Sequence, residues 1–192
     1  MRVRGVMAML AVLIAAGCGD GGTGVDDGPA PALPAVPAET VLLEDNFDAE
    51  NGGVGTLNWR GFANWSVGNG CVDLHGNGFH DVQPGSGLYV DLDGTCRAGG
   101  TLESRTQFAL EPGDYVLEFG VAGNRRVNEP DTVTVSLGTL FQEQLVLQRT
   151  AAFTTYAREV RVTTAATARI RFVHAGGDDQ GIVLDLVRLR RK

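Results

Sequence analysis

The chain has 192 residues, of which 43% are hydrophobic, and a formal charge of −7. Residues 1–39 contain two arginines, three aspartates and one glutamate, a net −2, which leaves −7 − (−2) = −5 for residues 40–192. A mildly acidic domain of this size, with basic residues gathered only at its C-terminal end, excludes nucleic acid as the expected partner. We interpret the closing Arg188, Arg190, Arg191 and Lys192 as a solubilising edge or a frayed end.

The first 17 residues have the pattern of a secretory signal. Arg2 and Arg4 precede an uncharged apolar run at residues 6–16. Eleven residues rise only ~16 Å as a helix, about half of a ~30 Å hydrocarbon core, so a cleaved signal is favoured over a spanning helix. The run ends in AAGC, which resembles the bacterial lipobox and implies that Cys18 is lipidated, although Ala15 stands where a leucine is usual. Ordinary cleavage nearby, with Cys18 lost or left as a thiol, is the alternative.

Residues 18–39 follow as a linker made mostly of Gly, Pro, Ala and Asp, without periodicity. Such a segment cannot bury enough apolar surface to offset the entropy lost on ordering, so we expect a flexible tether. The predicted organisation is a signal peptide at 1–17, the lipidated cysteine and linker at 18–39, and one domain at 40–192. The protein would be exported and held by its lipid at the bacterial cell envelope, in the periplasm or on the outer surface.

The domain is predicted to be all-β. Residues 114–122, 131–137 and 167–173 alternate apolar and polar side chains with the period of two that is typical of a half-buried strand. Gly-rich turn sequences separate the segments, and none has a 3.6-residue period. We therefore predict an antiparallel β-sandwich of the jelly-roll type. Further candidate strands are 40–47, 62–67, 71–75, 87–92, 101–110, 140–147, 156–163 and 181–189.

The stretch CVDLHGNGFHD at residues 71–81 has the side chains of either a metal site or a polar turn. Cys71 and Cys96 form an even pair in an exported domain, which predicts a disulfide, with two thiols or thiolate ligands as the alternative. His75 and His80 are five residues apart, which matches no recognised zinc spacing. We therefore expect a disulfide-flanked loop in which Asp73, His75 and His80 are candidate ligand contacts.

Two further segments carry candidate ligand contacts. Tyr89, Asp91 and Asp93 share one face of the predicted strand 87–92 and could hydrogen-bond sugar hydroxyls. The carboxylate pair also raises the possibility of a glycosidase, but residues two apart on one strand do not give the opposed acid and base. Asn124, Arg125, Arg126 and Asn128 lie in a polar loop and offer donors that could meet hydroxyls or carboxylates, although a solvated hairpin loop is the alternative.

The two tryptophans receive different predictions. Trp65 alternates with Val67 and is expected in the core. Trp59 lies in a Gly- and Asn-rich segment and is the better candidate for an exposed ring that stacks on a sugar.

Six segments carry a family resemblance through their order: EDNFDAENGG, LNWRGFANWSVGNGCVDLHGNGFHD, PGSGLYVDLDGT, GTLESRTQFALEPGDYVLEFGVAGNRR, DTVTVSLG and GGDDQGIVLDLVRL. This succession resembles secreted bacterial domains of the choice-of-anchor type, which are similar to plant cell-wall proteins with galactose-binding-like jelly rolls. The resemblance covers residues 42–189. It implies a non-catalytic β-sandwich that binds carbohydrate or another extracellular polymer.

The resemblance also implies a structural Ca²⁺, which related carbohydrate-binding jelly rolls often hold between the first acidic stretch and the final strand. The matching positions are Asp45, Asp48, Glu50 and Asp185. Carboxylates and the carbonyls of Gly-rich turns are suitable oxygen ligands. Leu186 departs from the asparagine that is more frequent in relatives.

The prediction for function is an exported, membrane-anchored and non-catalytic module that binds a glycan or a cell-envelope polymer. A structural or adhesive envelope protein without a small ligand is the main alternative, and a glycoside hydrolase is a lesser one. The chain has no GxSxG, HExxH or GxxxxGK[ST] motif.

Overall fold

The structure, a computed structural model, describes residues 39–126 and 129–192. The predicted signal peptide, Cys18 and nearly all of the predicted linker lie outside these residues. The described residues form strands and one short 3₁₀ turn, η1 (Glu50–Gly53). No helix among them is long and apolar enough to cross a membrane. The strands are β1 (Thr40–Asp45), β2 (Trp65–Gly68), β3 (Asp73–Gly76), β4 (Leu88–Asp91), β5 (Thr101–Ser104), β6 (Phe108–Leu110), β7 (Gly113–Ala122), β8 (Asp131–Leu137), β9 (Phe141–Leu147), β10 (Thr154–Val162), β11 (Ala166–Ala168), β12 (Ile170–His174) and β13 (Val183–Arg191).

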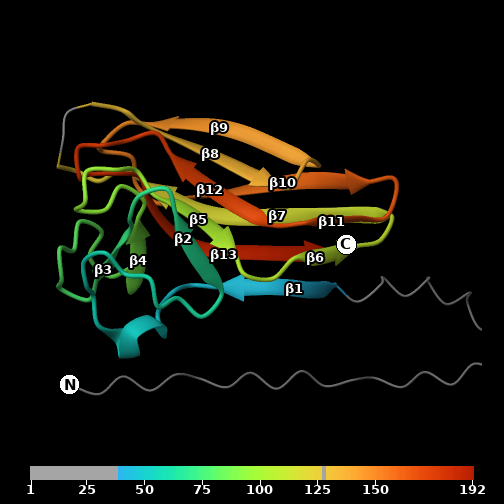
Figure 1. The fold of residues 1–192 in the computed structure, drawn as a ribbon, viewed down its shortest axis with the longest axis horizontal. Coiled ribbons are helices and arrows are strands. Elements are labelled where there is room, and N and C mark those ends of the chain that lie inside the picture. Colours follow the sequence, from blue (N-terminus) through green and yellow to red (C-terminus); the bar gives the residue numbers. More distant parts are fainter. Residues whose placement is uncertain (1–38, 127–128) are drawn as a thin grey trace, which may run out of the picture. The chain divides into compact units, whose positions relative to one another are not determined.

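The strands form two antiparallel sheets, as predicted for a jelly-roll sandwich (Figure 1). The first sheet has the order β10-β7-β13-β4-β3, and β1 also pairs with β13. The second sheet has the order β2-β5-β12-β8-β9, and β6 pairs separately with β11. Period-two alternation places one face of each sheet in a shared core, so the predicted fold class is confirmed.

Aromatic rings fill the centre of this core. Trp65 is fully buried, as predicted, with its ring centroid 6.0 Å from that of Phe172 and 6.1 Å from that of Phe47. The indole Nε1 of Trp65 donates a 2.9 Å hydrogen bond to Asp45 Oδ2, so the buried polar atom is satisfied. The core cluster draws all its residues from positions 42–189, so we expect residues 39–192 to fold without the preceding segment.

Two predicted strands, 101–110 and 167–173, are each divided in the structure. Ser104 Oγ accepts from the Ile170 amide at 3.0 Å and donates to the Thr106 carbonyl at 2.9 Å. The Arg169 guanidinium donates to the carbonyls of Ser104 and Arg105. Because side chains take these backbone groups, both segments leave the larger sheet at the same level and pair again as β6 and β11.

The predicted disulfide between Cys71 and Cys96 is confirmed, with a Cα–Cα distance of 6.1 Å. It joins Cys71, two residues before the start of β3, to Cys96 in the loop at 92–100. The Gly94 amide also donates to the Cys71 carbonyl at 3.0 Å, so this loop is fastened to the start of β3 at two points.

Removal of the cross-link should destabilise the domain. The chain-entropy model gives roughly 3.5 kcal/mol for a closed loop of about 26 residues. We expect the double variant Cys71→Ala/Cys96→Ala of residues 39–192 to lose about that much unfolding free energy in urea titrations, with a somewhat larger m-value because the unfolded chain without the cross-link exposes more surface. A loss below about 1 kcal/mol would mean that the fold holds the two segments together without the bond.

Candidate functional site at the loop end of the sandwich

Buried polar residues gather at one end of the sandwich, on the left in Figure 1. The ends of β4, β7 and β12 and the starts of β3, β8 and β13 meet there, as their pairings show. The connecting segments at 92–100, 123–126 and 175–182 therefore lie at the same end. The fourth loop, 77–87, folds back over the outer face of β3 and β4.

His75 lies at the centre of this end and is 1% exposed. Its Nδ1 is 3.7 Å from Asp91 Oδ2 and its Nε2 is 3.8 Å from Asp73 Oδ2. Neither ring nitrogen has a hydrogen-bond partner within the described residues. Burial, followed by the charges of Arg126 and His80, lowers the pKa of His75 to about 3, whereas burial raises the pKa of Asp91 well above its usual range.

The carboxylates of this centre hold loops through backbone amides. Asp73 accepts from the amides of Asn58 (2.7 Å) and Thr95 (3.2 Å). Asp91 Oδ1 accepts from the amides of Asp93 (3.1 Å) and Gly181 (2.8 Å). These bonds satisfy loop donors that would otherwise be buried without partners.

Asp93 and His174 are also buried, and Gly176 lies against both side chains. Asp93 Oδ2 accepts from the Asp178 amide at 3.1 Å, and His174 Nε2 accepts from the Ile182 amide at 3.1 Å. A Cβ on Gly176 would lie 2.3 Å from Asp93 Oδ2 and 2.4 Å from His174 Nδ1, so only glycine fits between these side chains. Burial lowers the pKa of His174 to about 4. Between pH 6.5 and about 4 the unfolded chain therefore binds a proton at His174 that the folded protein does not. The free energy of unfolding falls as the pH is lowered through that window.

Tyr89 and Asn124 fix the two remaining loops. The Tyr89 hydroxyl accepts from the amides of Val82 (2.7 Å) and Gln83 (3.1 Å) and donates to Asp81 (3.0 Å), and burial raises the pKa of Tyr89 to about 12. Asn124 is fully buried, and its Nδ2 donates to Asp131 Oδ2 (2.8 Å) and to a backbone carbonyl of the 175–182 loop.

Six predicted ligand contacts are therefore closed to a ligand in this structure, each at most 1% exposed. The predicted alternation along β4 is correct, but its second face is covered by the 77–87 loop and by Phe153, whose ring lies 5.8 Å from that of Tyr89. These side chains position the loops instead. The six residues are Asp73, His75, Tyr89, Asp91, Asp93 and Asn124.

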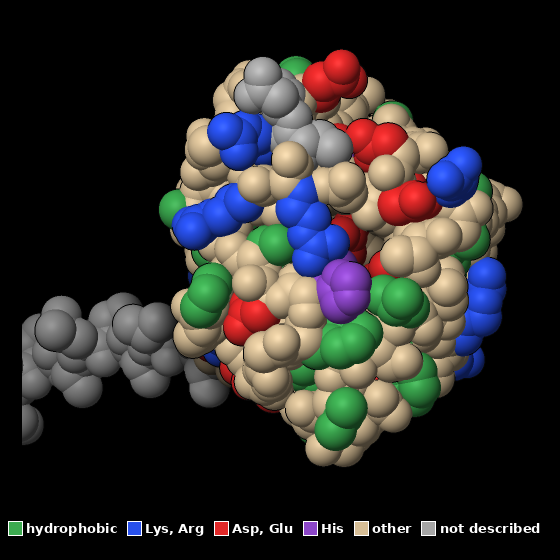
Figure 2. Space-filling view, turned by 90° about the vertical axis from the view of Figure 1, so that its left-hand side faces the viewer, with side chains coloured by type: hydrophobic (Ala, Val, Ile, Leu, Met, Phe, Trp, Pro, Cys, Tyr) green, Lys and Arg blue, Asp and Glu red, His purple; other side chains and the backbone are tan. Residues whose placement is uncertain are grey.

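Residues that do face solvent form a rim around the buried centre. His80 is exposed, and its ring stacks on that of His75 with centroids 5.3 Å apart and planes at 21°. Phe79 is half-buried, and its ring centroid lies 4.6 Å from that of His80. Arg125 is exposed, as predicted for a loop donor, and so is Arg126, which donates from its guanidinium to the His80 carbonyl at 2.9 Å. Figure 2 shows this end, with a histidine beside a band of basic side chains.

Phe79 was not among the residues predicted from the sequence. A turn signal was present for it: Asn77 and Gly78 have φ values of 51° and 86°, and the amides and carbonyls of Gly76 and Phe79 bond reciprocally at 2.9 Å. An Asn-Gly pair with both residues at positive φ forms a type I′ turn, which displays the residues that follow it. Arg126 was among the predicted loop donors, but its contact with the distant His80 had no sequence signal.

Trp59 is only half-buried, but one side of its ring is covered. It contacts Phe62 edge-on at 6.4 Å and lies over Gly61, where an added Cβ would be 2.5 Å from the indole. Its Nε1 points at Glu50 Oε2, 3.5 Å away. The ring therefore offers a ligand less area than its sequence context predicts.

The four predicted calcium positions lie at the β1–β13 side. The carboxyl of Asp185 has a pKa raised to about 6 by burial and then by the charges of Asp48 and Asp45, so these three groups lie near one another. Glu50 is buried, and its Oε1 accepts from the Ala63 amide at 2.8 Å, which ties η1 to a neighbouring loop. Across residues 39–126 and 129–192, no three His, Cys, Asp or Glu side chains are placed to hold a metal ion together. Calcium binding stays a prediction.

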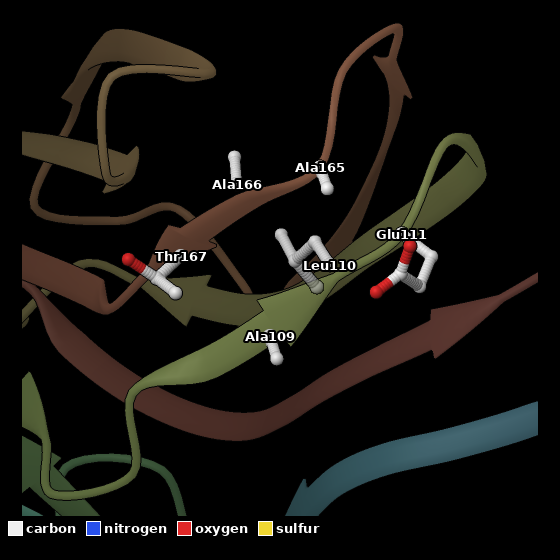
Figure 3. Close-up of a pocket in the computed structure, with 6 residues that line it drawn as sticks. All are labelled: Ala109, Leu110, Glu111, Ala165, Ala166 and Thr167. Carbon is white, nitrogen blue, oxygen red and sulfur yellow. The ribbon is translucent and has the colours of Figure 1, made fainter.

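A depression of about 350 Å³ lies between β6 and β11, lined by Ala109, Leu110, Glu111, Ala165, Ala166 and Thr167 (Figure 3). Its lining is mostly small and apolar, with one carboxylate. It contains none of the predicted site residues.

No protein-family model matches the sequence, and a search of curated proteins found no match. Solved structures do match. They include the C-terminal family 6 carbohydrate-binding module of a laminarinase from Zobellia galactanivorans (15% identity, 78% of this chain, 98% of that chain, TM-score 0.45). A carbohydrate-binding module of a Cellvibrio mixtus lichenase, in complex with cellotriose, matches at 16% identity (79% and 98% covered, TM-score 0.42). The K1 cleaved adhesin domain of Lys-gingipain from Porphyromonas gingivalis matches at 19% (78% and 98% covered, TM-score 0.49).

The stability of the loop end should depend on the ionisation of Asp131. Burial, followed by the charges of Asp178, Asp93 and Glu129, raises its pKa to about 7 from 3.8. The folded protein therefore binds a proton between pH 3.8 and 7 that the unfolded chain does not, so this residue costs stability as the pH rises through that window. Asp131→Asn keeps an acceptor for Asn124 and should raise the Tm at pH 8 by roughly 3–6 °C, with the difference vanishing near pH 4. A pH-independent difference in calorimetric scans would contradict the assignment.

If Asp45, Asp48 and Asp185 bind calcium, an excess of Ca²⁺ should raise the Tm by several degrees over that in EDTA, because the ion binds only the folded state. Asp185→Asn should abolish the response, whereas Asp114→Asn, in an exposed ion pair elsewhere, should retain it. Identical melts in Ca²⁺ and EDTA would rule out a structural ion there.

Proposed function

We propose that this chain is a non-catalytic glycan-binding domain that is exported and held at the cell envelope through lipidated Cys18. The observation that carries the binding proposal is the rim at the loop end, where His80 and Phe79 present rings beside the guanidinium group of Arg126 and the exposed Arg125 precedes it in the chain. Flat rings stack against the apolar faces of pyranoses, and fixed polar donors orient hydroxyl groups.

The base beneath the rim is rigid, which supports a binding function. The His80 ring rests on buried His75, and the Arg126 amide donates to Asn124 Oδ1 at 2.7 Å. The Gln83 side chain donates to the Gly123 carbonyl at 2.9 Å and so joins the two loops that form the rim. Because the groups are held before a ligand arrives, little conformational entropy is lost on binding.

The carboxylates of this end favour binding over hydrolysis. A glycosidase needs one carboxyl group as acid and another as base or nucleophile on opposite sides of the scissile bond. Asp91 and Asp93 are buried, lie on one chain segment and accept from backbone amides. They therefore support loops and do not face a substrate.

Export and anchoring rest on the N-terminal sequence, with its short apolar run, its AAGC end and its linker. The Cys71–Cys96 disulfide supports an oxidising compartment.

A glycan array with residues 39–192 tests the function directly. Binding to at least one polysaccharide should weaken roughly tenfold in His80→Ala, the size expected for one lost ring contact. Gln144→Ala, an exposed change on β9, serves as the control and should bind as wild type. Trp59→Ala tests whether the ring that was predicted from the sequence contributes to the affinity in addition to the rim.

Absence of binding across plant, algal and bacterial polysaccharides would overturn the proposal and leave a structural or adhesive envelope protein as the better account. Release of sugar from a bound polysaccharide would contradict the non-catalytic assignment.

A further inference from the structure

Most basic side chains of this acidic domain are paired with carboxylates. On the outer face of the first sheet, Arg190 pairs with Glu118 of β7 at 3.0 Å and Arg188 with Glu44 of β1 at 3.3 Å, so these two residues of the C-terminal basic run are neutralised. The residues with a carboxylate partner are Arg97, Arg158, Arg161, Arg169, Arg171, Arg188, Arg190 and Lys192.

A second group of arginines uses backbone carbonyls. The side chains of Arg60, Arg105 and Arg191 each donate to carbonyls of neighbouring segments. Their charges are therefore spread over backbone dipoles, and each guanidinium fastens a loop.

Arg125 and Arg126 differ from both groups. Neither forms an ion pair with any residue in the described part of the chain, and both are exposed. The described residues account for one hydrogen bond from the Arg126 side chain, to the His80 carbonyl, out of the five donor hydrogens of a guanidinium. Two adjacent cations without a carboxylate partner are unexpected in a domain with a net charge of −5, since the surface offers many acidic groups.

The backbone that carries these two arginines is fixed on both sides. The Arg125 amide donates to the Arg149 carbonyl at 2.9 Å, and the Arg149 side chain donates back to the Arg125 carbonyl at 3.3 Å. The Arg126 amide is held by buried Asn124. The Arg126 guanidinium group therefore projects from a fixed backbone beside His80, and the exposed Arg125 directly precedes it; Figure 2 shows a histidine beside basic side chains at this end.

We infer that this part of the rim selects anionic glycans, with Arg125 and Arg126 binding the carboxylate or sulfate groups of a polysaccharide whose pyranose ring lies against His80 and Phe79. The inference rests on the proposed glycan-binding function and names its ligand class. A guanidinium presents a planar fork that matches the two oxygens of a carboxylate or sulfate, which lysine does not. The neighbouring rings explain why the anion would be part of a sugar and not a small ion.

Titration calorimetry of residues 39–192 tests this inference with oligogalacturonate, a sulfated galactan and a neutral galactan of similar length. At least one anionic glycan should bind roughly tenfold or more tightly than the neutral one, as expected for a charge-assisted contact, and the advantage should shrink as salt screens the charges. The carboxylate and sulfate arms distinguish the two anion sources.

Arg125→Gln and Arg126→Gln should each weaken anionic binding roughly tenfold and leave the Tm nearly unchanged. Arg126→Lys keeps the charge but not the fork and should bind less tightly than wild type. Arg161→Gln, exposed and paired with Asp114 away from the rim, is the matched control and should bind as wild type.

Equal affinity for neutral and anionic glycans, or unchanged anionic binding in both glutamine variants, would overturn the inference while the glycan-binding function stands. Equal binding of polyglutamate would also overturn it, because charge alone would then suffice. No binding to any glycan would instead refute the proposed function itself.

Discussion

Buried carboxylates organise the functional end of this sandwich. Asp73 and Asp91 lie at the ends of short strands and Asp93 lies two residues beyond β4; all three have almost no exposure, and each accepts hydrogen bonds from amides of the loops around it. A buried carboxylate without donors would cost several kcal/mol, so the loops can close over the strands only where their amides reach these oxygens. That requirement determines where the loops at 92–100 and 175–182 lie.

The buried centre determines the positions of the rim residues. His75 stacks beneath His80, and Tyr89 and Asn124 fasten the 77–87 loop and the 123–126 segment, which carry the exposed groups. The same burial makes the carboxylates unsuited to acid–base chemistry on a ligand. The proposed binding surface therefore consists of exposed side chains on a hydrogen-bonded base, whereas the outer face of the first sheet carries ion pairs such as Arg190–Glu118.

Sequence reasoning predicts the sandwich well, because period-two alternation is a local property of each strand. β7 and β8 match the predicted segments at nearly every residue, and Trp65 is in the core as expected. The division of the predicted strands 101–110 and 167–173 was not predictable, since it depends on Arg169 reaching carbonyls some 64 positions away in the chain.

The candidate site was likewise predictable only where it depends on a local pattern. Alternation correctly places Tyr89 and Asp91 on one face, but only tertiary structure reveals that a loop covers that face. The Arg126–His80 contact joins residues 46 positions apart and had no local signature.

The central claim is that the ligand lies across the His80–Arg126 rim. The most direct measurement is an NMR titration of residues 39–192 with oligogalacturonate, followed at the backbone amides. The account predicts that shift changes concentrate in residues 78–83 and 123–126, with His80 and Arg126 among the largest, while β6, β9 and β11 stay unperturbed. Changes centred on the β6–β11 depression or on the outer face of β8 and β9, with the rim unaffected, would contradict it.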